Sequence, residues 1–152
     1  MKAEPLIFQS DSTEATEKFA ADLAGKLPWG SVLALHGNLG AGKTVFSRGF
    51  ARGLQITEPI SSPTFTIVQE YPCDGGMFFH LDLYRIDNSD SAYAFGIDEF
   101  LYDSGAMTLI EWPERIQDIL PETTIHVTIE AQDMMEKRKI TVVFPTEMET
   151  VK

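Results

Sequence analysis

A glycine-rich segment, HGNLGAGKT (residues 36–44), places the strongest constraint on how this chain can fold. It follows SVLALH (31–36), a nearly continuous apolar run of the kind found in strands buried on both faces. The apolar residues after it recur at helical spacing, namely Val45, Phe46, Phe50 and Leu54. A strand, a glycine-rich turn and a helix in this order predict a phosphate-binding unit of an α/β protein.

The glycine-rich segment satisfies the pattern G-x-x-x-x-G-K-[ST] at every position. Its glycines allow successive backbone N–H groups to point inward and to bind phosphate oxygens. Lys43 is expected to reach the β and γ phosphates of a nucleotide, and the hydroxyl of Thr44 is expected to coordinate Mg²⁺. The nucleotide-binding residues predicted here are Asn38, Leu39, Gly40, Ala41, Gly42, Lys43 and Thr44.

The other apolar runs predict the remaining elements of one α/β domain. Strands are expected within residues 5–10, 61–72, 75–87 and 106–112, and an antiparallel hairpin within 123–131 and 138–145. Further helices are expected over 11–27 with Asp11 as N-cap, around 95–101, and from Pro113 onward. We therefore predict a single-domain, P-loop NTPase-like fold over residues 1–152, with three layers, a mostly parallel central sheet and an antiparallel C-terminal edge hairpin. Residues 146–152 are expected to be a frayed tail.

The charge of the chain argues against direct binding to nucleic acids. There are 23 acidic and 12 basic residues, so the average field repels phosphate backbones. The basic run KRK (137–139) is interpreted as a solvated turn. No apolar run approaches the roughly 18 residues of a membrane span, and the single cysteine, Cys73, allows no disulfide within the chain. We expect a cytoplasmic protein that binds neither membrane nor DNA.

Two carboxylates near strand ends are candidates to complete the site. Glu111 directly follows the apolar run AMTLI, where an acid can bind the metal. Asp82 lies in FFHLDLYR, on the same side of a predicted strand as His80 and Tyr84. The structural alternatives are that Glu111 caps the following helix and that Asp82 pairs with Arg85. Asp82 and Glu111, together with Lys43, form the predicted catalytic set.

Two further residues are assigned to the site with open alternatives. Thr64 lies in the hydroxyl-rich segment 61–66, where a switch-type nucleotide protein senses the γ phosphate, although Pro63 would also set an ordinary turn here. Trp112 can lie against the nucleotide or fill the core. His36 is interpreted as a structural end to its strand and His126 as a surface residue. Neither histidine is expected to be catalytic.

Four motifs in order resemble one family of bacterial ATPases, the TsaE family of tRNA threonylcarbamoyladenosine (t6A) biosynthesis. They are LHGNLGAGKT, SSPTFTIVQEY, HLDLYRI and LIEWPER, and the resemblance covers residues from about 10 to 130. It implies a Mg²⁺-dependent ATPase that binds ATP and ADP and acts with the partner proteins TsaD and TsaB, which modify adenosine 37 of tRNA. It also implies that the chain meets tRNA only indirectly and does not itself carry the transfer chemistry.

The resemblance assigns a role to each matching residue. Lys43 and Thr44 would bind phosphates and Mg²⁺, and Glu111 would be the metal-side acid. Asp82 would belong to the catalytic set. Thr64 would belong to a switch-like loop, and Trp112 would border the site.

Two other functions use the same loop. A small-molecule kinase usually carries an arginine-bearing lid, but the five arginines form no paired cluster in a long polar insertion: Arg48, Arg52, Arg85, Arg115 and Arg138. A GTP-dependent switch of the Ras-like class reads guanine with an N-K-x-D element, and this tetrapeptide is absent from the sequence. Phosphate transfer to a metabolite, or competition of GTP against labelled ATP, would favour these alternatives.

Overall fold

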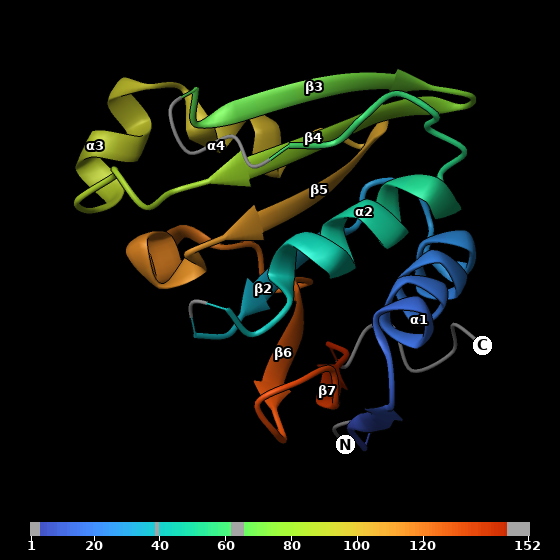
Figure 1. The fold of residues 1–152 in the computed structure, drawn as a ribbon. Coiled ribbons are helices and arrows are strands. Elements are labelled where there is room, and N and C mark those ends of the chain that lie inside the picture. The colour runs from blue at the N-terminus through green and yellow to red at the C-terminus, as the bar shows by residue number, and fades with distance from the viewer. Residues whose placement is uncertain (1–3, 39, 62–65, 146–152) are drawn as a thin grey trace.

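Residues 4–38, 40–61 and 66–145, which the computed structural model describes, form one seven-stranded sheet flanked by helices (Figure 1). The strand order is β1-β7-β6-β2-β5-β4-β3. The strands are β1 (Leu6–Ser10), β2 (Val32–His36), β3 (Val68–Cys73), β4 (Gly76–Asp82), β5 (Ala106–Glu111), β6 (Ile125–Ala131) and β7 (Arg138–Val143). The helices are α1 (Thr13–Lys26), α2 (Lys43–Gly53), α3 (Ser89–Ala94), α4 (Ile97–Leu101) and a 3₁₀ helix, η1 (Pro113–Ile119).

The centre of the sheet is parallel and its two edges are antiparallel. Strands β6, β2, β5 and β4 lie parallel to one another, whereas β3 pairs antiparallel with β4, and β7 with β6. The predicted C-terminal hairpin is therefore present. It lies one strand inside the edge, because β1 pairs along the other side of β7, from Leu6 opposite Val142 to Ser10 opposite Arg138.

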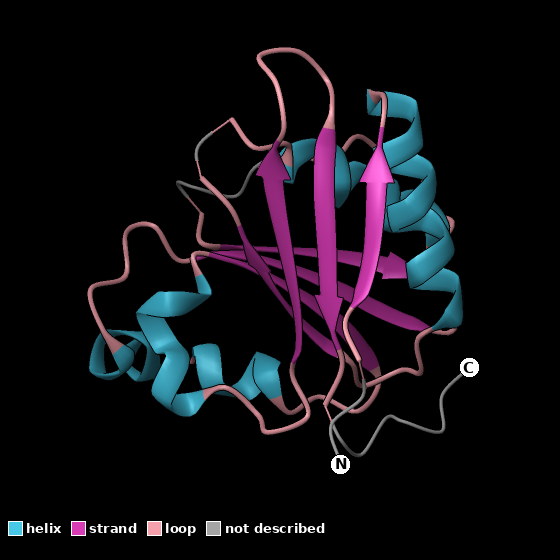
Figure 2. Ribbon diagram, turned by 90° about the horizontal axis from the view of Figure 1, so that it is seen from below, coloured by secondary structure: helices cyan, strands magenta, loops and turns pink. Residues whose placement is uncertain are grey.

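Helices cover both faces of the sheet, which confirms the predicted three-layer fold (Figure 2). One buried cluster lies under α1 and α2, and a second lies under α3, α4 and η1. Strand β2 contributes to both, because Leu33 and Leu35 belong to the first cluster and Val32 to the second. Its continuous apolar sequence follows from burial on both faces.

Helices α1 and α2 approach each other at two glycines of α2. A Cβ atom added to Gly49 would lie 2.3 Å from the backbone oxygen of Glu17, and one added to Gly53 would lie 2.3 Å from that of Ala21. A methyl group therefore has no room at either position. The weak helix propensity of glycine is outweighed by this packing, and α2 continues as far as Gly53.

Two local predictions are wrong. Helix α1 is capped by Ser12 instead of Asp11, because the helix begins one residue later than expected and the Ser12 hydroxyl accepts a hydrogen bond from the N–H of Ala15. The basic run 137–139 is not a solvated turn. Its second residue, Arg138, already belongs to β7 and is half-buried.

Three predictions fall on residues outside the described part of the chain: the roles of Leu39 and Thr64, and the frayed tail at 146–152. They stay predictions. Within residues 4–38, 40–61 and 66–145, none of the helices combines the length with the apolar character that crossing a membrane requires.

Candidate functional site

The candidate site lies where the carboxyl ends of three parallel strands meet. Strand β5 is the middle strand, with β2 on one side and β4 on the other. In register, Glu111 at the end of β5 lies opposite Leu35 of β2 and Asp82 of β4. Because the glycine-rich loop directly follows β2, the topology brings the loop and both predicted carboxylates to one edge of the sheet.

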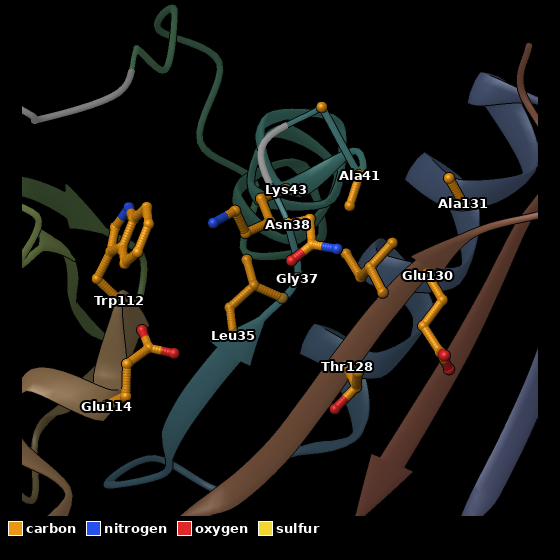
Figure 3. A pocket seen from close by; sticks show the side chains of 12 residues that line it. Leu35, Gly37, Asn38, Ala41, Lys43, Trp112, Glu114, Thr128, Glu130 and Ala131 are labelled. Carbon is orange, nitrogen blue, oxygen red and sulfur yellow. The ribbon is translucent and has the colours of Figure 1, made fainter. Parts of the chain in front are cut away.

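Two cavities flank the loop. The first, of about 680 Å³, lies between the loop, Trp112, Glu114 and the carboxyl end of β6, from Thr128 to Ala131 (Figure 3). We call it the β6 cavity. The second, of about 700 Å³, is the carboxylate cavity, and it is lined by Gly40, Gly42, Lys43, Thr44, Val45, Asp82, Tyr84, Glu111, Trp112 and Arg138. The predicted catalytic set thus lines a single cavity.

The loop has the backbone that its glycines predict. Gly40 and Gly42 have φ of 83° and 106°, a left-handed conformation that favours glycine. Gly42 is the residue before α2, so the unpaired N–H groups of the first helical turn begin here. These groups and the positive end of the helix dipole suit an anion such as a phosphate.

Lys43 is the buried cation of this loop. Its side chain is on the first turn of α2, and the residue is 8% exposed. The ammonium Nζ lies 4.9 Å from the centre of the Trp112 ring, so it faces the aromatic π surface (Figure 3). Because the lysine is already largely shielded from water, its ammonium would lose little further hydration when a phosphate binds.

Glu111 is held by His80 and is not a helix cap. The His80 Nε2–H donates to Glu111 Oε2 at 2.8 Å, and both side chains are buried. Trp112 occupies the position before η1, with φ of 60°, and no side chain caps that helix. Among the described residues, His80 Nδ1 has no hydrogen-bond partner. The histidine therefore positions the carboxylate of Glu111, a residue that lines the carboxylate cavity.

Asp82 is also buried beside the site. Its Oδ1 accepts a hydrogen bond from the N–H of Tyr84 at 3.0 Å, which bends the chain just after β4. The predicted alternation of His80 and Asp82 is confirmed for these two buried residues, whereas Tyr84 leaves the strand and is exposed.

Trp112 combines the two roles considered from the sequence. Its ring is half-buried against the cluster under α3, α4 and η1, and it lines both cavities. Tyr84 packs against it edge-on, with ring centres 5.0 Å apart, and Arg115 lies 5.5 Å from the ring centre. The indole is thus packed on one side and available to the cavities on the other.

Sequence reasoning missed two features beside the loop. Arg138 of β7 donates from Nε to the carbonyl of Ala41 at 2.7 Å. His126, predicted to be a surface residue, is half-buried, and its Nδ1 lies 3.0 Å from Nε2 of His36. The parallel pairing of β2 with β6 brings the two histidines together, and the β6–β7 hairpin brings the arginine. Neither could be seen without the order of the strands.

The histidine pair predicts a pH-dependent stability. Burial lowers the pKa of His36; Glu114 opposes this shift and Lys43 adds to it. Burial also lowers the pKa of His126, with a smaller contribution from His36. Both histidines therefore bind protons more readily in the unfolded chain, so stability is full above the unfolded pKa of about 6.5 and falls as pH drops below it.

A comparison of melting temperatures tests this expectation. The wild-type protein should lose more stability between pH 7.5 and 5 than the double variant H36Q/H126Q, which lacks both imidazoles. Thermal unfolding followed by circular dichroism at each pH provides the measurement. An equal loss in the two proteins would show that other groups, such as the carboxylates, account for the acid sensitivity.

Comparisons with known proteins identify the family. Residues 10–140 match the family described as threonylcarbamoyl adenosine biosynthesis protein TsaE. The chain is 42% identical over 120 residues to tRNA threonylcarbamoyladenosine biosynthesis protein TsaE of Bacillus subtilis, covering 78% of this chain and 72% of that protein. It is 38% identical over 121 residues to the protein of that name from Treponema pallidum, covering 79% of this chain and 87% of the other.

A solved structure agrees with these relatives. The crystal structure of Bacillus subtilis YdiB superimposes with a TM-score of 0.80 at 34% sequence identity, over 95% of this chain and 90% of that one. The α/β fold predicted from the sequence is thereby confirmed. The family resemblance carried by the four motifs is confirmed as well, and the chain belongs to the TsaE family of threonylcarbamoyl adenosine biosynthesis proteins.

Proposed function

We propose that this protein is a Mg²⁺-dependent ATPase that supports t6A modification of tRNA together with TsaB and TsaD. One observation carries the ATPase assignment. The loop residues Lys43 and Thr44 share a single cavity with the carboxylates Asp82 and Glu111. A phosphate cradle, a hydroxyl and two acids in one cavity are the parts that phosphoryl transfer to water requires.

The loop would bind the triphosphate. Backbone N–H groups around Gly42 and at the start of α2 would donate to phosphate oxygens, and Lys43 would place its charge between the β and γ phosphates. Lys43 is directed into the cavity and faces Trp112, so little movement is needed to reach a ligand there. The indole would then exclude water on that side of the phosphates.

The donor set suits Mg²⁺, which prefers oxygen ligands and is usually held by one or two protein groups. The Thr44 hydroxyl and the Glu111 carboxylate line the same cavity and would hold the ion. When bound, Mg²⁺ would neutralise charge that develops on the phosphate oxygens. His80 would keep one oxygen of Glu111 occupied and so orient the other, and Asp82 would accept a hydrogen bond from the attacking water.

The acidic charge of the chain fits a role beside a partner that holds the tRNA. A net charge of −11 disfavours independent tRNA binding, while it favours association with a basic protein surface. If this association is electrostatic, it should weaken markedly as ionic strength rises. The site is open, with both cavities reaching solvent, so turnover of the isolated chain is expected to be slow until a partner closes it.

The direct test is steady-state release of inorganic phosphate from ATP, with and without the TsaB–TsaD pair. Strong stimulation by the pair would support a partner-gated ATPase. Hydrolysis that is unchanged by the pair would contradict the assigned partners but not the ATPase. Transfer of the phosphate to a metabolite, with no release to water, would instead favour the kinase function.

Replacement of Glu111 by glutamine tests the role of the carboxylate. E111Q should leave the Kd for ATP within a few-fold of wild type but reduce hydrolysis at least tenfold, about 1.4 kcal/mol of transition-state stabilisation, because the amide is a poorer metal ligand. The matched control is E122Q, which removes an exposed carboxylate outside both cavities. Wild-type hydrolysis by E111Q would contradict the assignment of Glu111.

A further inference from the structure

Arg138 joins the sheet to the phosphate-binding loop. It is the first residue of β7, where it pairs with Ala131 of β6 and with Ser10 of β1. Its guanidinium extends to the loop, where Nε donates to the carbonyl of Ala41 at 2.7 Å and Nη2 lies 3.5 Å from the carbonyl of Gly40. Arg138 therefore anchors two successive carbonyls of the loop to the central sheet.

The anchor determines the direction of a backbone N–H group. In a trans peptide, the carbonyl and the N–H of the next residue point in opposite directions within one plane. Because the Ala41 carbonyl is turned toward Arg138, the N–H of Gly42 in the same peptide is turned away from the guanidinium. This N–H belongs to the group of donors that would bind phosphate at the start of α2.

The loop and the arginine fit each other closely. A Cβ added to Gly42 would lie 3.4 Å from Arg138 Nε and 3.9 Å from Cδ, which is ordinary contact distance, so the arginine side chain lies directly against this part of the loop. Nη1 donates to the carbonyl of Lys137 at 2.9 Å, which fixes the guanidinium from its other side. The planar fork of the guanidinium presents several donors in a fixed geometry, so one side chain can bond these carbonyls together.

We propose that Arg138 is a positioning residue for nucleotide binding, which holds the loop in the conformation that receives the β and γ phosphates. The inference rests on the proposed function. It adds a residue that lies far from the loop in sequence and that the G-x-x-x-x-G-K-[ST] pattern does not include. Its role depends on the geometry of its donors and not on its charge alone.

Three variants separate geometry from charge. R138M keeps an apolar stem but removes every donor, whereas R138K keeps the charge but cannot reach two carbonyls in the same way. K137M is the matched control, because it removes a neighbouring exposed positive charge that lines neither cavity. Isothermal titration with ATP and with ADP should give a Kd raised roughly tenfold for R138M and at least threefold for R138K, with K137M within twofold of wild type.

A kinetic measurement distinguishes positioning from a general loss of structure. KM for ATP should rise in R138K while kcat at saturating ATP stays within twofold, because Asp82 and Glu111 are untouched. Thermal unfolding without nucleotide identifies the folded variants, and if R138M does not fold, R138L, which also lacks a donor, replaces it. Wild-type affinity in R138M or R138L, or full recovery in R138K, would overturn the proposal. Failure of the wild-type protein to bind ATP would instead contradict the proposed function.

Discussion

Replacement of Lys43 by methionine is expected to raise the Kd for ATP at least 100-fold. Methionine keeps an unbranched side chain against Trp112 but removes the ammonium that faces its ring at 4.9 Å. A factor of 100 corresponds to about 2.7 kcal/mol, within the range for a hydrogen bond to a charged group together with its Coulomb energy. Isothermal titration with ATP in the presence of Mg²⁺ measures the change directly.

The control for this variant is K18M. Lys18 lies on α1, its side chain is 79% exposed, and its ion pair with Asp22 is a surface contact of small energetic value. The variant K18M therefore removes a positive charge that lies outside the loop, and its Kd for ATP should equal that of wild type. Equal affinities of K43M and K18M would show that the glycine-rich loop does not bind triphosphate through its lysine.

Substitution of Gly49 by alanine is expected to cause the largest loss of stability. The added Cβ would lie 2.3 Å from the backbone oxygen of Glu17, and a backbone atom cannot move aside as a side chain can. Overpacking commonly costs about 1–3 kcal/mol, and contact with backbone favours the upper end of that range or more. The melting temperature should fall by roughly 6–12 °C, as about 3 kcal/mol implies for a chain of this size.

Gly25 offers a matched control in the neighbouring helix. A Cβ added there meets nothing within 4 Å, so G25A removes a helical glycine without a clash. It should leave the free energy of unfolding unchanged or raise it by up to about 1 kcal/mol, since alanine is the better helix former. Urea titrations of both variants give the comparison. A stable G49A would mean that α1 and α2 can separate without loss of packing.

The sequence predicted the parts of the site that depend on local pattern and parallel pairing. Strand, loop and helix around Lys43 follow from glycine spacing and apolar periodicity. The meeting of Asp82 and Glu111 follows because both end strands of a parallel sheet, whose carboxyl ends share one edge. These are regularities of backbone geometry, and they hold whatever the detailed packing.

The sequence could not predict contacts that depend on strand order and register. Arg138 reaches Ala41 because β7 folds back on β6, and nothing in the sequence around the KRK run indicates this contact. The bond from His80 to Glu111 requires β4 and β5 to be neighbours with one register of pairing. The role of Gly49 was also missed, because a glycine that lowers helix propensity gives no sign of the neighbouring helix that needs it.

The position of β1 has a consequence for how the protein becomes functional during synthesis. Strand β1 is made first, yet it pairs with β7, with Leu6 opposite Val142. It must therefore wait until almost all of the described chain has left the ribosome, and this late pairing closes the longest loop in the fold. Strand β7, which β1 covers in this last step, begins with Arg138, the residue that anchors the phosphate-binding loop. Full affinity for nucleotide is thus expected to arise only at the last step of folding, so a nascent chain would bind ATP more weakly before its sheet is complete.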